Sequence, residues 1–149
     1  MSRFEDRLIE ALSKEMNSET NSEGTRKSET SESDAGFVTD IETDTIEGEN
    51  YREVLYTAPH SQLVLMSLKP GEEIGAETHE DGDQFIRFES GSGEVILNGK
   101  TSKVKDGSAV VIPAGVSHSV INTGSEDLKL YAIYSPPEHP EGTVDKTKV

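Results

Sequence analysis

Two stretches of the sequence decide the fold: residues 71–91, which read GEEIGAETHEDGDQFIRFESG, and residues 107–122, which read GSAVVIPAGVSHSVIN. Both alternate short apolar runs with glycine, proline and acidic turn residues, which is typical of short β-strands joined by tight turns. Each also carries one histidine near an end of a predicted strand, His79 in the first and His118 in the second. The two stretches therefore predict a β-fold, and their histidines mark where its functional site would lie.

The same strand-like pattern extends from Phe37 onward and predicts nine short strands with no helix between them. Asn98-Gly99 is typical of a two-residue hairpin turn, because both positions tolerate positive φ angles. The predicted strands cover residues 53–57, 62–68, 76–79, 84–89, 94–98, 101–104, 109–112, 117–122 and 128–135. We therefore expect an all-β sandwich or barrel.

The first 36 residues differ from the rest in composition. A capping pattern and apolar residues at helical spacing predict a short amphipathic helix over residues 2–16. Residues 16–36 contain only Met16 and Ala35 as apolar side chains, which is typical of a disordered segment. We therefore expect a helix and a disordered acidic linker over residues 1–36 and a globular domain over residues 37–149.

The chain of 149 residues contains no cysteine and carries a formal net charge of -15. The lack of cysteine excludes a disulfide framework, thiolate metal ligands and a cysteine nucleophile. The negative charge argues against nucleic acids and anionic membrane surfaces as partners, since both need clustered lysine and arginine. Charges interrupt the apolar residues of the first helix, so we expect no secretory signal or transmembrane segment and a cytoplasmic protein.

Four side chains around the two histidines are candidates for one site. Residues two apart in a strand point to the same face, so Glu77 and His79 should project together. A turn over residues 80–83 would return the chain antiparallel and let Gln84 face the same space, and a later strand would add His118. Two imidazoles and a carboxylate that converge inside a β-barrel suit a divalent transition metal.

Over roughly residues 51–137, these motifs resemble the two signature motifs of the cupin superfamily. The resemblance implies a small jelly-roll barrel with one metal site, often in a homodimer. The whole stretch of residues 37–148 is similar to small single-domain bacterial cupins, some of which are labelled as similar to mannose-6-phosphate isomerase. The expected fold is therefore a cupin barrel, preceded by the short helix and the disordered acidic segment.

The chain departs from the common cupin pattern at two ligand positions. Glu77 stands where the family usually has its first histidine, and Gln84 stands where it usually has glutamate. Because the two changes compensate in charge, we expect a rearranged site with Glu77, His79, Gln84 and His118 as ligands of a divalent metal. If Gln84 stays unbound, the remaining two-His-one-carboxylate set suits Fe(II) and dioxygen; if it binds, Mn, Zn or Ni suit the site equally.

The ligand that we expect is a small polar metabolite, in an isomerase-like or an Fe-dependent dioxygenase-like reaction. In an isomerase reaction, Glu77 would act as a base beside the metal instead of binding it. The alternatives are a non-catalytic module that binds a small sugar or acid, and a barrel that has lost its metal and serves as a scaffold. The other two histidines, His60 and His139, are expected to be structural or exposed.

Overall fold

The computed structural model describes residues 35–148. Residues 41–149 group into one compact unit, which contains all the elements that follow. The helix predicted over residues 2–16 lies outside the described residues, as does nearly all of the linker predicted up to Gly36. The part of the chain that the structure describes contains no helix long and apolar enough to cross a membrane.

The described residues form one short helix and ten strands. The helix is α3 (Ile41–Glu47), which packs against β2, β4 and β9 and buries Thr45. The strands are β1 (Arg52–Thr57), β2 (Gln62–Leu68), β3 (Glu73–Glu77), β4 (Asp83–Ser90), β5 (Ser92–Leu97), β6 (Lys100–Lys105), β7 (Ala109–Ile112), β8 (His118–Ile121), β9 (Leu128–Ser135) and β10 (Val144–Asp145).

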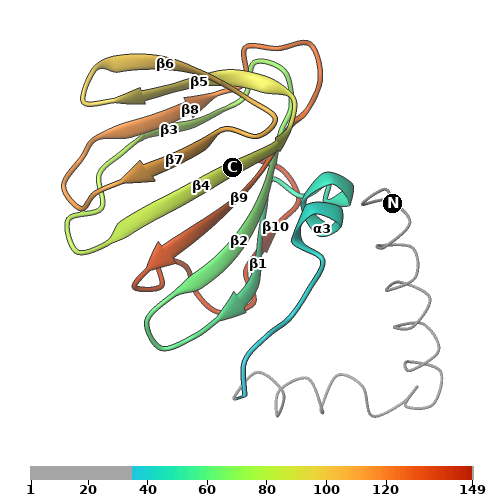
Figure 1. The fold of residues 1–149 in the computed structure, drawn as a ribbon, viewed down its shortest axis with the longest axis vertical. Coiled ribbons are helices and arrows are strands. Elements are labelled where there is room, and N and C mark those ends of the chain that lie inside the picture. The colour runs from blue at the N-terminus through green and yellow to red at the C-terminus, as the bar shows by residue number, and fades with distance from the viewer. Residues whose placement is uncertain (1–34, 149) are drawn as a thin grey trace. The chain divides into compact units, whose positions relative to one another are not determined.

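The strands form two sheets (Figure 1). The larger sheet has the order β10-β1-β2-β9-β4-β7, and the smaller one has the order β3-β8-β5-β6. Alternate residues of both sheets contribute to one hydrophobic core, for example Ile86 and Phe88 of β4 and Val120 of β8, all fully buried. The core therefore lies between the two sheets, as in a jelly-roll barrel.

The predicted all-β class is confirmed, and all nine predicted strands are present. The bounds of β2, β7 and β9 match the prediction residue for residue. The predicted hairpin between β5 and β6 is also present, because Asn98 and Gly99 adopt φ angles of 47° and 82°. These elements could be predicted because alternation and turn chemistry are local properties of the sequence.

Two expectations around His79 are wrong. Strand β3 ends at Glu77, where its pairing with β8 stops, so His79 lies in the loop beyond the strand. The turn over residues 80–83 does not return the chain beside β3, because β3 pairs with β8 whereas β4 pairs with β7 and β9. The segment between β3 and β4 therefore crosses from one sheet to the other.

Candidate metal centre

Glu77 and His118 are brought together by strand pairing. Glu77 is the last residue of β3 and lies directly opposite His118, the first residue of β8. Directly opposite residues in an antiparallel pair point to the same face. His118 is 2% exposed, whereas the side chain of Glu77 is 40% exposed. The pair therefore has one buried member and one that solvent can reach.

Two hydrogen bonds tie the His79 loop and the first residue of β4 to the turn that precedes β8. The backbone N–H of Gly115 donates to the carbonyl oxygen of His79 over 2.9 Å. The N–H of Ala114 donates to Oδ1 of Asp83, also over 2.9 Å. Because this turn leads directly into β8, the two hydrogen bonds place the His79 loop close to His118.

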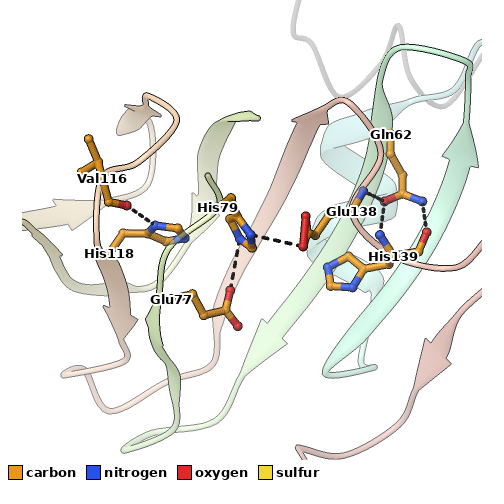
Figure 2. Close-up of polar contacts among 7 residues, drawn as sticks. All are labelled: Gln62, Glu77, His79, Val116, His118, Glu138 and His139. Atoms are coloured by element: carbon orange, nitrogen blue, oxygen red, sulfur yellow. Dashed lines mark hydrogen bonds and ion pairs between the residues drawn. The ribbon is translucent and has the colours of Figure 1, made fainter. Parts of the chain in front are cut away.

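The structure brings Glu77, His79 and His118 into one cluster, in which one ligand atom of each residue lies within 4.8 Å of the others. Nε2 of His79 lies 3.3 Å from Oε2 of Glu77 (Figure 2). The two imidazole rings have their centroids 5.1 Å apart and are tilted by 45°. Three of the four predicted site residues therefore meet, although His79 reaches the cluster from a loop.

Each imidazole has an oxygen acceptor at Nδ1. Nδ1 of His118 lies 3.0 Å from the carbonyl oxygen of Val116, and Nδ1 of His79 lies 3.2 Å from Oε1 of Glu138. An acceptor at Nδ1 favours the tautomer with hydrogen on Nδ1, which leaves a lone pair on Nε2. Among the described residues, neither buried Nε2 atom makes a hydrogen bond, and Nε2 of His79 has only its ion-pair contact with Oε2 of Glu77. The two nitrogens therefore fit a metal cation.

Gln84, the fourth predicted ligand, comes from the larger sheet. It is buried on β4, directly opposite Tyr134 of β9. Its Oε1 atom is buried and has no hydrogen-bond partner among the described residues. An unsatisfied buried amide oxygen costs free energy unless something binds it, and a cation would do so. The donor set of two nitrogens, a carboxylate and this amide oxygen therefore fits a divalent metal, and coordination by Gln84 stays a prediction.

Two aromatic side chains border the cluster. The Tyr134 ring meets the His79 ring edge-on at 5.8 Å. Burial, with a further contribution from the Glu77 carboxylate, raises the pKa of Tyr134, so its hydroxyl stays protonated at neutral pH and cannot act as a base. Burial, followed by the Arg52 guanidinium, lowers the pKa of His139, whose ring packs against Tyr134 at 5.1 Å.

The sequence gives no signal for two residues that contact this region, Gln62 and Glu138. Gln62 begins a strand whose only visible pattern is apolar, and Glu138 lies in a segment that reads PPEHPEG. Glu138 contacts His79 across 59 positions of sequence, so no periodicity or local spacing connects the two residues. Only the three-dimensional path of the chain after β9 brings them together.

Comparison with known proteins adds a family match. The family model described as "Cupin domain" matches residues 64–134. YrkC, an uncharacterized protein of Bacillus subtilis, is 48% identical over 119 residues, which cover 75% of this chain and 63% of that protein. The chain thus spans less than two thirds of the length of this relative.

Two further proteins are informative. The crystal structure of a Bacillus halodurans protein has a TM-score of 0.73 at 44% identity, covering 74% of this chain and 89% of that one. The oxalate-binding protein of Thermotoga maritima is 35% identical over 68 residues, which cover 46% of this chain and 56% of that protein.

Proposed function

Because the chain belongs to the cupin superfamily, we propose that it binds a divalent transition metal through Glu77, His79 and His118 and holds a small carboxylate there. The observation that carries this proposal is the pair of buried Nε2 atoms, which make no hydrogen bond among the described residues and converge with the carboxylate of Glu77. Gln84 would add its amide oxygen from the opposite sheet. Mn, Fe, Zn and Ni remain candidates, since all four accept such ligands.

Charge supports a carboxylate as the ligand. The four candidate ligands carry one negative charge in total, so a divalent cation and these ligands would together carry one net positive charge, with the Glu138 carboxylate outside them at His79. When bound, the cation would supply Lewis acidity toward an anionic oxygen. The partly exposed Glu77 side chain leaves the centre within reach of a small molecule. The similarity to an oxalate-binding protein is consistent with this ligand class.

Binding without turnover is the alternative function. If Glu77 binds the metal, the cluster of Glu77, His79 and His118 keeps no free carboxylate of its own for proton abstraction, and the nearest other carboxylate, that of Glu138, contacts His79. Burial raises the pKa of Tyr134, which disfavours its hydroxyl as a base. An isomerase-like reaction and an Fe-dependent dioxygenase-like reaction both stay predictions. The same holds for the likeness to mannose-6-phosphate isomerase and for a cytoplasmic location. Oxygen uptake with candidate acids would reveal a dioxygenase.

The proposed function predicts that ligand binding depends on metal. Protein purified without chelator or histidine tag should hold about one ion per chain, since the cluster offers a single set of ligands. After removal of the metal and reloading with Zn²⁺, Mn²⁺, Fe²⁺ or Ni²⁺ in turn, calorimetry should detect oxalate binding only to loaded protein. A neutral sugar serves as the control ligand. Metal content that stays well below one ion per chain after resupply would contradict the metal site. Equal oxalate binding to metal-free and metal-loaded protein would contradict a role of the metal in holding oxalate.

We also propose that the chain forms a homodimer through the outer face of the larger sheet. Val111 of β7 is 66% exposed there, and it pairs with Phe85, whose ring lies 6.3 Å from that of Tyr131. An exposed valine beside two partly buried aromatic rings is a surface that a subunit interface could cover. Sedimentation should therefore show a dimer for the wild type and a monomer for Val111→Lys, with Thr101→Lys on β6 of the smaller sheet as the control. A wild type that stays monomeric at high concentration would exclude the dimer.

A further inference from the structure

Gln62 connects the larger sheet to the segment that follows β9. It is the first residue of β2 and is 1% exposed. Its Nε2 donates to Oγ1 of Thr57 over 2.9 Å and to the carbonyl oxygen of His139 over 2.8 Å. Its Oε1 accepts from the backbone N–H groups of Glu138 and His139, over 3.1 and 3.0 Å. The amide thereby uses both of its donors and accepts two hydrogen bonds.

These contacts fix the backbone of Glu138 beside the candidate metal centre. Figure 2 shows Gln62 holding the backbone of Glu138 and His139 while the Glu138 carboxylate points toward His79. The Glu138 side chain is 40% exposed, and an exposed glutamate normally loses side-chain entropy when it is held in one place. With its backbone already held, Glu138 has fewer degrees of freedom to lose in making the 3.2 Å contact with His79.

The two histidines of the cluster are therefore oriented by different parts of the chain. His118 uses the carbonyl oxygen of Val116, two residues away on the same turn. His79 uses a side chain from the segment after β9. A histidine that carries its hydrogen on Nε2 cannot bind a metal through that atom, so the acceptor at Nδ1 controls whether the ligand is available.

We propose that Glu138 is a positioning residue for the metal centre and that Gln62 is the buried clamp that holds it in place. Glu138 accepts the Nδ1 hydrogen of His79, which leaves Nε2 free to bind the metal and makes the imidazole a more basic ligand. Neither residue needs to touch the metal. This inference rests on the proposed metal function and adds a second set of residues on which that function depends.

The direct test compares Glu138→Ala, Glu138→Gln and a charge-matched control, Glu141→Gln, in the full-length protein. Glu141 is exposed on the same segment. Zn²⁺ affinity, measured by competition with a chelator, should fall about 10–100-fold in Glu138→Ala. Glu138→Gln should recover most of that loss, since an amide oxygen still accepts the Nδ1 hydrogen. Glu141→Gln should bind Zn²⁺ like the wild type.

A second readout needs no metal. Nitrogen NMR of the metal-free protein reports which ring nitrogen of a neutral imidazole carries the hydrogen. Without metal, the carboxylates of Glu138 at Nδ1 and of Glu77 at Nε2 compete for the hydrogen of His79. The share of the Nδ1 form should therefore be larger in the wild type and in Glu138→Gln than in Glu138→Ala. A structural role of Glu138 alone would not move this signal.

The clamp is tested by a double-mutant cycle. Gln62→Ala should weaken Zn²⁺ binding although it removes no ligand, and adding Glu138→Ala should weaken it little further, because both changes break the same support. Circular dichroism verifies that Gln62→Ala is folded.

Fully additive losses of Zn²⁺ affinity would overturn the role of Gln62 as the clamp. A Glu138→Ala protein with the Zn²⁺ affinity and the His79 tautomer of the wild type would overturn the positioning role of Glu138. If the wild type binds no metal, the proposed function fails, and the tautomer comparison still decides the role of Glu138.

Discussion

His118→Ala should lower the affinity for Zn²⁺ by more than about 100-fold, beyond the loss that follows removal of an outer-shell partner. His118 is the most buried member of the cluster, and its Nδ1 contact with Val116 leaves Nε2 available to the metal. His79 already contributes its own ligand atom, and the other two described histidines, His60 and His139, lie outside the cluster, so no imidazole is placed to replace His118. Metal content after purification and chelator competition would both measure the effect.

The matched control is His60→Ala. His60 is exposed in the connection between β1 and β2, so its removal deletes an imidazole without changing the cluster. It should retain the metal content and Zn²⁺ affinity of the wild type. Because His118 is buried, urea unfolding must first establish that His118→Ala is folded. A folded His118→Ala protein with wild-type affinity would show that the metal, if present, is bound elsewhere.

Gly93→Ala should destabilise the fold by about 3 kcal/mol, at the upper end of the usual cost of overpacking. A Cβ atom at this position of β5 would lie 2.3 Å from the carbonyl oxygen of Ile121 and 2.9 Å from Cδ2 of Leu128. Ile121 is the last residue of β8, the strand that begins at His118. The backbone of β8 cannot yield without disturbing its pairing, so the substitution strains the sheet that holds the candidate site. Urea denaturation at equilibrium measures the loss.

Gly75→Ala provides the comparison on β3. A Cβ atom at Gly75 would meet no other atom within 4 Å, so the free energy of unfolding should change by less than about 0.5 kcal/mol. Both variants make the same chemical change within a strand of the smaller sheet. Equal losses in the two variants would mean that the close approach at Gly93 is not the cause.

Much of the fold could be predicted because its signals are local. The alternation in β2 and β9 and the Asn98-Gly99 turn are visible within a few residues of sequence. Helix α3 was not predicted, because only its first and sixth residues are aliphatic and no apolar stripe forms. Strand β10 has only two residues, too few to show any alternation.

The candidate site was predictable only in part. The motifs identify Glu77, His79 and His118, which the structure brings together. The strand argument for His79 fails, because pairing with β8 ends at Glu77 and the chain then crosses to the other sheet. The contact with Glu138 depends on the path of the chain after β9, and a sequence pattern cannot report a contact between segments so far apart.

The position of β9 in the larger sheet has a consequence for how the chain is made. β9 lies between β2 and β4, yet it is synthesised after both of them. While the ribosome is still producing residues 91–127, β2 and β4 each lack the neighbour that pairs with them along most of their length. Unpaired strand edges on a nascent chain invite wrong pairing and aggregation. Assembly of the larger sheet, and with it the Gln62 contacts, must therefore wait until β9 and the segment that follows it have been synthesised.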